Sequence, residues 1–468
     1  MSIFSSPEEA RLGSLGFAPF LPSPPLPNIV AEWTAILPLA CHLATQRDDY
    51  ITTGDVALLG RLSVGLFPRL GTLSGLSRLL DRGTKYLDHA STRGGSSRTV
   101  WDVKWGSVFP CANGAACTAI SKCLISQNTD PPQRMPETIP HQPQGNEHEK
   151  APSQNKSTIR THNQFEGEVH LNDAKKGHAK QEVIRRPQIL HVYQLYQKPR
   201  RHSLRQRIDQ LCQSVPGQMI WLIFLVSIAV FLCLLGSYGS AALVVCTSVS
   251  ELVALGITIR RPFLYLKNNE NHDACMLVAS HENAIEWHLY IGDRAVADTL
   301  LNKAMFIIPE GKSTHLASRW FWFANLLQFT AMTFVAAQKG WDGVCMVVLL
   351  GFHWALRWFP CGRTLAHGWL ERESVEAKVR SFEYSGRTAM LGAIQIFSGS
   401  AITSWMDNIL APHPRRDAWL KRLRGEKSTD NFDSHDIRWL EFTTEASFAS
   451  AEVLKSVFGV SGKCKASV

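Results

Sequence analysis

The stretch MIWLIFLVSIAVFLCLL, which runs from Met219 to Leu235, has no charged residue and is long enough to cross the apolar core of a bilayer as one helix. A second apolar stretch, from Ser240 to Ile259, follows after the short turn GSYG. Because so short a turn leaves no room for another element, the two stretches predict a helical hairpin in a membrane.

A second pair of apolar stretches predicts a second hairpin. The first runs from Trp320 to Ala337 and the other from Val344 to Trp358, joined by the short QKGWDG. The last stretch is short for a span, but Arg357 can extend it by placing its charged end in the headgroup layer. The sequence therefore predicts a mainly α fold with four membrane spans in two hairpin regions, residues 198–259 and 320–358.

Basic residues beside the spans predict the orientation of both hairpins. They are Lys198, Arg200, Arg201, Arg205, Arg207, Arg260 and Arg261 around the first hairpin, and Arg319, Arg357 and Arg363 around the second. Positive residues favour the cytosolic side, and the two connecting turns together carry only one Lys and one Asp. We therefore expect an integral, multi-pass membrane protein with both termini and residues 260–319 and 359–468 in the cytosol.

The composition supports a membrane location and argues against a nucleic-acid partner. The 468 residues are 45% hydrophobic and 19% charged, with a formal net charge of +9. The basic residues cluster beside apolar stretches, where anionic lipid headgroups account for them, so the lipid bilayer is the expected partner. The 11 cysteines include no CxxC pair, so free thiols are expected. No basic start followed by an apolar core opens the chain, so insertion is expected to use an internal span.

The N-terminal region, residues 1–125, is expected to be cytosolic and partly formed by amphipathic helices. From Asp55 to Arg82, leucines recur at helical spacing with arginines between them. This pattern is typical either of helices on a membrane surface or of helices packed on their neighbours. The apolar segment from Ile29 to Leu43 is a poor span because Glu32 and Pro38 interrupt it, and whether it is a fifth membrane segment stays open.

Two further regions are polar. Residues 126–197 are rich in Pro, Gln, Asn, His and charged residues, and they predict a disordered linker because such a segment cannot offset the entropy of ordering. Its sequon at Asn155 is expected to stay unmodified in the cytosol. In the C-terminal region, the stretch from Ala389 to Leu410 and the basic PHPRRDAWLKRLRGEK after it suit either an anionic membrane surface or a packed helix with a solvated face.

The stretch HENAIEWHLYIGDR, from His281 to Arg294, groups two histidines, three carboxylates and an arginine. Apolar and polar residues alternate from Ile285 to Ile291, which predicts a strand with one buried face. Glu286, His288 and Tyr290 fall on the other face. They are weak candidates for a catalytic role, against the alternative that they are solvated or hydrogen-bonded residues of a half-buried strand.

The residues around this strand predict a small β-β-α unit in the cytosolic loop 260–319. The apolar segment 273–279 is short enough to be the partner strand, and Asp293 can cap a helix that follows. His281 begins a partial HExxH pattern, but Ile285 stands where the second histidine would be. The sequence therefore predicts neither a metal nor a cofactor here.

Three polar residues fall inside the predicted spans. Glu251 lies past the middle of the second span, Gln328 near the middle of the third and His353 within the fourth. Ionisable groups at such depth are costly, so a Glu and a His that face each other could relay protons or bind a cation. The alternative is that these residues make hydrogen bonds between helices.

The run CMLVASHENAIEWHLYIGDRAVADTLLNKAMF, followed by two apolar spans, resembles uncharacterised multi-pass integral membrane proteins of filamentous ascomycete fungi. The resemblance covers roughly residues 215–410 and is carried by the EWHLYIGDR…LLNK core. It implies a multi-pass membrane protein, of a kind sometimes encoded beside biosynthetic gene clusters, and it implies no reaction.

Together these patterns favour a non-catalytic accessory or scaffold protein of a membrane, with a link to a fungal biosynthetic pathway and a protein partner or a second copy bound through the cytosolic loop. The alternative is a small oligomeric transporter or channel that uses Glu251 and His353. A third hypothesis is a membrane-bound enzyme that uses the stretch from His281 to Arg294.

Overall fold

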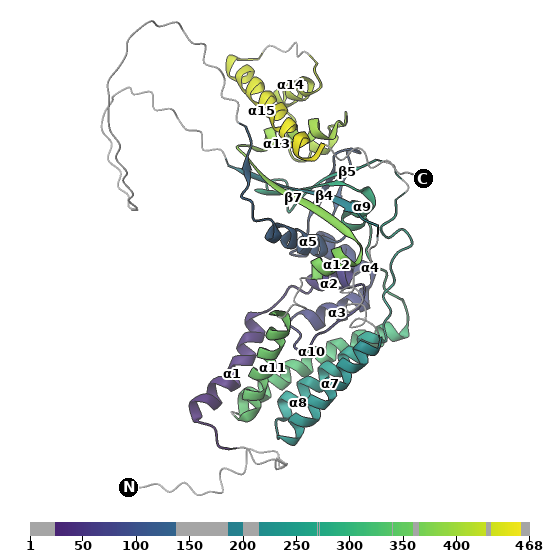
Figure 1. Cartoon of the computed structure of the whole chain (residues 1–468), viewed down its shortest axis with the longest axis vertical. Coiled ribbons are helices and arrows are strands. Elements are labelled where there is room, and N and C mark those ends of the chain that lie inside the picture. Colours follow the sequence, from purple (N-terminus) through teal and green to yellow (C-terminus); the bar gives the residue numbers. More distant parts are fainter. Residues whose placement is uncertain are drawn as a thin grey trace, which may run out of the picture.

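The computed structural model describes residues 24–136, 186–199, 215–268, 270, 272–338, 340–358, 365–426 and 432–459. Along the long axis of the molecule, a bundle of helices at one end is followed by a group of shorter helices and then by a sheet with further helices beyond it (Figure 1). The apolar and polar segments of the sequence are thus separated in space.

The bundle contains α7 (Val215–Leu234), α8 (Tyr238–Leu255), α10 (Lys312–Gln338), α11 (Trp341–Trp358) and α1 (Asn28–Ala44). Within the described residues, three helices, α7, α8 and α10, are long and apolar enough to cross a membrane, while α1 and α11 are shorter apolar helices. α8 packs on α7 and α10, and α1 packs on α10 and α11. The predicted spans are therefore all helical, and the apolar segment before residue 45 joins them as α1.

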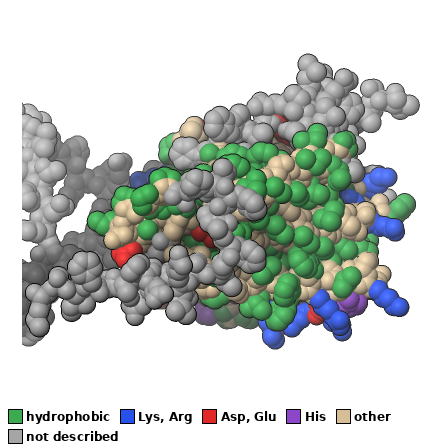
Figure 2. Space-filling model, turned by 90° about the horizontal axis from the view of Figure 1, so that it is seen from below, with side chains coloured by type: hydrophobic (Ala, Val, Ile, Leu, Met, Phe, Trp, Pro, Cys, Tyr) green, Lys and Arg blue, Asp and Glu red, His purple; other side chains and the backbone are tan. Residues whose placement is uncertain are grey.

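The outside of the bundle is apolar. Large hydrophobic side chains are exposed on its helices, among them Trp33, Ile36, Ile223, Trp322 and Val348. Figure 2 views the molecule from the bundle end and shows hydrophobic side chains gathered over this surface, with Lys and Arg side chains at its edge. Water-exposed surfaces rarely carry so large an apolar area, and a bilayer is the solvent that suits it.

The shorter helices between bundle and sheet are α2 (Ile51–Leu59), α3 (Thr72–Arg82), α4 (Thr84–Thr92), α5 (Gly114–Gln127) and α12 (Leu365–Arg372) (Figure 1). The leucines of α3 are buried, and this helix packs along α10. Of the two alternatives for the segment from Asp55 to Arg82, the structure thus has helices packed on their neighbours. The segment is also broken at residues 60–71, which form an irregular loop.

The described residues form one seven-stranded sheet in the order β2-β1-β5-β6-β4-β7-β3. The strands are β1 (Thr99–Asp102), β2 (Val108–Pro110), β3 (Gln133–Arg134), β4 (Gln188–Gln197), β5 (Ala274–Ala279), β6 (Glu286–Gly292) and β7 (Val375–Tyr384). β4 pairs parallel with β6 and antiparallel with β7. The sheet is therefore mixed, and its central strands come from distant parts of the sequence.

Helices cover both faces of this sheet. α5 and α9 (Arg294–Leu301) pack on one face, and α13 (Arg387–Ser398), the 3₁₀ turn η2 (Ser404–Met406), α14 (Pro414–Leu423) and α15 (Ser434–Phe458) pack on the other. α13 to α15 lie at the end of the molecule opposite the bundle (Figure 1). The basic segment around α14 is thus a packed helix remote from the bundle, with Trp419 fully buried.

The strands and the helix predicted within the loop 260–319 are present as β5, β6 and α9. The Asp293 side chain caps α9 by accepting a hydrogen bond from the Ala295 amide (2.8 Å). The β-β-α unit is not separate, however, because β5 and β6 lie in the middle of the larger sheet.

β4 corrects the prediction of a disordered linker over residues 126–197. This strand lies between β6 and β7, and α5 and β3 take up further residues of the same segment. The sequence did not predict this strand because the average polarity of the segment is high and QILHVYQLYQ carries polar residues on both faces. A sheet covered on both faces buries them all the same, as at His191 and Gln194. Residues 137–185, including Asn155, lie outside the described residues.

Candidate functional site

The loop 60–71, between α2 and α3, enters the sheet-side end of the helix bundle. Leu66 packs among side chains of α7, α8 and α11, and Phe67 packs among side chains of α8, α10 and α11. The loop has no regular hydrogen bonds of its own in this region. Irregular backbone is tolerated at membrane depth only where the protein satisfies its polar groups, so the bundle must supply partners.

Two of the predicted intramembrane residues supply these partners. The Glu251 Oε1 atom accepts hydrogen bonds from the backbone amides of Val64 (3.0 Å) and Gly65 (2.7 Å). The Gln328 Nε2 atom donates to the Pro68 carbonyl oxygen (2.8 Å), and Gln328 is only 3% exposed. Glu251 and Gln328 thus bind backbone groups of the inserted loop rather than side chains of neighbouring helices.

Glu251 also lines a cavity of about 310 Å³ together with His353. The cavity lies where the inserted loop meets the first turns of α7 and the sheet-side ends of α8 and α11. Its polar lining consists of Arg61, Ser63, Gln218, Trp221, Glu251 and His353. The structure therefore brings together two of the three predicted intramembrane residues, whereas Gln328 lies outside the lining.

Arg61 is the cationic group of this cavity, and the sequence analysis missed it. Its Nε atom is buried without a hydrogen-bond partner, and its guanidinium makes no ion pair within the described residues. Burial lowers the pKa of the Arg61 guanidinium; Glu251 opposes this effect and Arg372 adds to it. No local signal marks Arg61, because it is one of several arginines between leucines, and distant residues create its setting.

A second buried carboxylate holds the opposite end of the bundle. The Asp342 side chain, at the start of α11, accepts hydrogen bonds from the backbone amides of Gly239 (2.7 Å) and Ser240 (2.8 Å) and from the Ser240 hydroxyl. A Cβ atom on Gly239 would lie 2.4 Å from Val335 Cγ2, so only glycine permits this approach. Asp342 thereby ties the start of α8 to the start of α11.

Two of the three candidate residues of β6, His288 and Tyr290, lie in a ladder of mostly buried side chains. β4 and β6 pair in register, with His191 beside His288 and Tyr193 beside Tyr290. The two imidazole rings stack at 5.5 Å and the two phenol rings at 4.9 Å between centroids. The Tyr193 hydroxyl lies 3.1 Å from His288 Nδ1. His288 and Tyr290 are therefore not on a solvated face, as a half-buried strand would have placed them.

Both ends of this ladder bind further side chains. The His191 Nδ1 atom lies 2.8 Å from the Ser381 hydroxyl of β7. The Tyr290 hydroxyl lies 2.7 Å from the Ser121 hydroxyl and 3.0 Å from Cys117 Sγ, both on α5. Burial, together with His191 and Arg98, lowers the pKa of His288 to about 3. Burial, together with Cys117, raises the pKa of Tyr290 well above its usual value.

The remaining charged residues of the stretch from His281 to Arg294 are separated. Glu286 is exposed at the start of β6. Arg294 is 8% exposed and forms ion pairs with Asp102 (3.1 Å), Glu270 (2.6 Å) and Asp298 (3.5 Å), so it ties α9 to β1. Within the described residues, no group of three or more His, Cys, Asp and Glu side chains is placed to hold a metal ion.

Comparisons with known proteins identify no family for the chain. No protein-family model, curated protein or solved structure matches the chain. Function must therefore be inferred from the arrangement of the residues themselves.

Proposed function

We propose that this chain is a multi-pass integral membrane protein of accessory or scaffold type that holds its mixed sheet on the cytosolic side. The observation that carries the proposal is that the polar side chains of the bundle have structural partners. Glu251, Gln328 and Asp342 all bind backbone groups of the chain itself. Groups with such fixed structural partners support an architectural role better than a relay of protons or ions.

The proposal includes α11 and α1 as membrane segments beside α7, α8 and α10. α11 follows α10 through a short turn, and α1 packs along both, with an exposed apolar face at Trp33 and Ile36. At 1.5 Å per residue, the 17 residues of α1 would span about 25 Å, which suits a thin bilayer. In this proposal, α1 is therefore the fifth membrane segment.

The position of α1 alters the proposed topology. The start of α1 lies at the end of the bundle away from the sheet, next to the turn before α11, where the Trp341 indole donates a hydrogen bond to the Pro24 carbonyl oxygen. If the sheet is cytosolic, the residues before α1 lie on the opposite side. The proposal therefore keeps the sheet and the C-terminal helices in the cytosol and moves the N-terminus across the membrane.

A transporter that uses Glu251 and His353 is the second candidate, and their shared cavity favours it. Two features argue against a transporter. Glu251 already accepts two backbone hydrogen bonds, and Leu66 and Phe67 of the inserted loop occupy the space between the helices. An enzyme that uses the stretch from His281 to Arg294 has less support still, because Tyr290 and Arg294 are buried with partners and the half-buried His288 lies against the Tyr193 hydroxyl.

Two measurements on the full chain test the proposal. Resistance to alkaline carbonate extraction is expected of an integral protein, and its release into the soluble fraction would refute membrane insertion. In proteoliposomes, proton or cation flux is expected to equal that of protein-free vesicles. A flux that Glu251→Gln and His353→Ala both abolish would instead establish the transporter.

The topology has its own test. Labelling of single cysteines with a membrane-impermeant reagent in sealed vesicles is expected to place Asn28 and Ser434 on opposite sides, after each is replaced by Cys in a chain cleared of exposed thiols. Labelling of both positions from the same side would return the N-terminus to the cytosol and exclude α1 as a spanning segment.

A further inference from the structure

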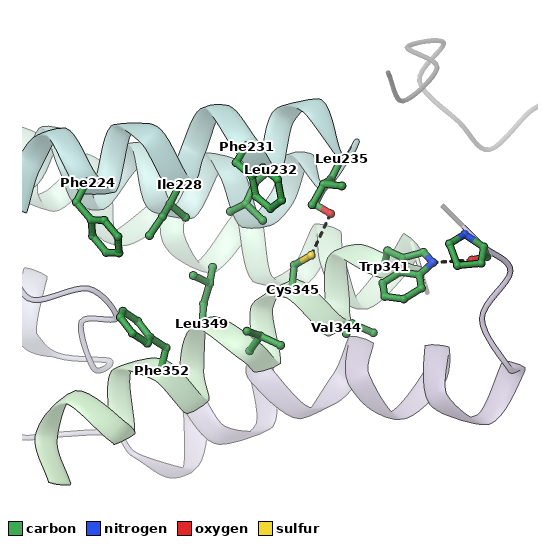
Figure 3. A pocket seen from close by; sticks show the side chains of 13 residues that line it. Phe224, Ile228, Phe231, Leu232, Leu235, Trp341, Val344, Cys345, Leu349 and Phe352 are labelled. Atoms are coloured by element: carbon green, nitrogen blue, oxygen red, sulfur yellow. Dashed lines mark hydrogen bonds between the residues drawn. The ribbon is translucent and has the colours of Figure 1, made fainter. Parts of the chain in front are cut away.

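An apolar groove runs between α7 and α11. α7 packs closely on α8 but not on α11, so the facing sides of α7 and α11 leave a space of about 540 Å³. Figure 3 shows Phe224, Ile228 and Leu232 from α7 opposite Leu349 and Phe352 from α11, all pointing into this space. The lining is almost wholly hydrocarbon, which suits an aliphatic chain.

The groove meets the polar cavity at the sheet-side end of the same two helices. On α7, Trp221 lines the cavity and Phe224, one turn later, lines the groove. On α11, the neighbours His353 and Phe352 line the cavity and the groove respectively. The Phe224 ring contacts Trp221 on one side (5.5 Å between centroids) and Phe352 on the other (6.4 Å). The polar cavity and the apolar groove therefore adjoin each other at the Phe224 ring.

The far end of the groove is closed. Trp341 and Pro24 line it there, and the hydrogen bond between them fixes the indole in place. From Trp341 to Phe352 the groove extends about 16 Å along α11 at 1.5 Å per residue. This is about the depth of one leaflet of a bilayer whose apolar core is ~30 Å thick. The site thus has the length of an acyl chain whose headgroup lies on the sheet side.

The charge of the polar end indicates the kind of headgroup. The Arg61 guanidinium lines this end without a hydrogen bond or ion pair to the described part of the chain. The opposing carboxylate, Glu251, is engaged by two backbone amides through Oε1. A half-buried cation that lacks a partner is costly, and a phosphate is the group that an arginine binds best.

We propose that the groove and the cavity together bind one anionic phospholipid whose headgroup faces the sheet side. Its phosphate lies against Arg61, and an acyl chain lies between α7 and α11 as far as Trp341. This inference rests on the proposed membrane insertion of these helices. It adds a specific lipid requirement to the accessory role, since the lipid would cover the side of α7 that faces α11.

The test compares lipid retention by the full chain and two matched charge variants. Arg61→Gln removes the cation of the cavity. Arg260→Gln removes an exposed cation near the sheet-side end of α8, outside the cavity lining. Each protein is reconstituted in nanodiscs of phosphatidylcholine with one tenth phosphatidylglycerol, released in mild detergent and analysed by native mass spectrometry. The wild type and Arg260→Gln are expected to retain one phosphatidylglycerol, and Arg61→Gln to retain at least tenfold less.

A groove variant keeps the test decisive if Arg61→Gln does not fold. Val348 lines the groove and is 63% exposed, so Val348→Trp fills the space without disturbing the packed interior. It is expected to abolish retention of phosphatidylglycerol while leaving the thermal unfolding temperature of the delipidated protein unchanged. Equal retention of phosphatidylglycerol by the wild type, Arg61→Gln and Val348→Trp, or retention of phosphatidylcholine at the same level, overturns the proposal.

Failure of this inference is distinguishable from failure of the proposed function. A chain that resists carbonate extraction and retains no anionic lipid is a membrane protein without this lipid site. A chain that carbonate releases refutes the membrane insertion itself, and the lipid site with it.

Discussion

The helix bundle and the sheet both bury polar side chains, but they satisfy them in different ways. In the bundle, Glu251 and Asp342 each bind backbone groups of one other segment. In the sheet, His288 and Tyr290 bind side chains on neighbouring strands and on α5. Glu251 and Asp342 thus each hold one backbone segment, whereas the sheet distributes hydrogen bonds over a chain of side-chain partners. Single substitutions are therefore expected to be more costly in the bundle.

Removal of the Asp342 carboxylate is expected to have the largest effect. Asp342→Ala leaves two buried amides without their acceptor, while the Ser240 hydroxyl keeps the carbonyl oxygen of residue 342, so the free energy of unfolding is expected to fall by about 4 kcal/mol. Titration of the purified protein with sodium dodecyl sulfate, followed by tryptophan fluorescence, measures the loss. Asp342→Asn is the control, because it keeps one acceptor oxygen and should lose less. Equal stability of wild type and Asp342→Ala would remove the contrast between bundle and sheet.

Substitution of Glu251 is expected to loosen the inserted loop. Glu251→Ala deprives the amides of Val64 and Gly65 of their acceptor, which should cost about 2–3 kcal/mol and speed hydrogen exchange at those two amides. Glu251→Gln keeps Oε1 as an acceptor and should preserve most of the protection. Unchanged exchange at both amides in Glu251→Ala would show that the loop is held by Leu66 and Phe67 alone.

Acid is expected to destabilise the sheet. The pKa of His288 is about 3 in the folded chain, below its ordinary value of 6.5, so the unfolded state binds a proton first. The stabilisation is complete above pH 6.5 and is lost as the pH falls toward 3. At pH 5 the loss from His288 is about 2 kcal/mol, and it should appear as faster exchange of β4 and β6 amides after correction for intrinsic rates. His288→Gln should flatten this dependence, and a wild-type sheet that is equally protected at pH 7 and pH 5 contradicts it.

Removal of one ladder hydroxyl is expected to have the smallest effect. Tyr290→Phe removes the contacts to Ser121 and Cys117, but the Ser121 hydroxyl keeps its bond to the Cys117 carbonyl oxygen, so the cost should be about 1 kcal/mol. Tyr86→Phe is the matched control, because the Tyr86 hydroxyl is buried without a partner and its removal should be neutral or stabilising. Urea denaturation of both variants measures the difference. A loss of stability in Tyr290→Phe as large as that in Asp342→Ala would contradict the expected difference between bundle and sheet.

Local patterns in the sequence were sufficient for elements whose partners are close in the chain. The apolar runs predict the helices of both hairpins, and alternation from Ile285 to Ile291 predicts β6. The Asp293 cap follows from its position before α9, and its bond to Ala295 spans two residues. These features depend on periodicity and on neighbours within one turn, which a single sequence contains.

The parts that the sequence did not predict depend on distant partners. β4 is buried because β6 and β7 flank it and helices cover both faces, and none of these neighbours lies within its own segment. Glu251 and the Val64 amide are 187 residues apart, so nothing near Glu251 indicates that a loop is its partner. The setting of Arg61 is likewise created by α7, α8 and α11. Average polarity and local spacing carry no information about such contacts.

The position of β4 also has a consequence for biosynthesis. β4 is made before α7 and α8, but its neighbours β6 and β7 are made only after the first hairpin and after both hairpins, respectively. At about 5–20 residues per second, the interval between β4 and β7 lasts on the order of 10–40 s. Both edges of β4 are unpaired until β6 has been made, and the edge that pairs with β7 stays unpaired through the whole interval. Completion of the sheet therefore has to wait until both apolar hairpins have been made.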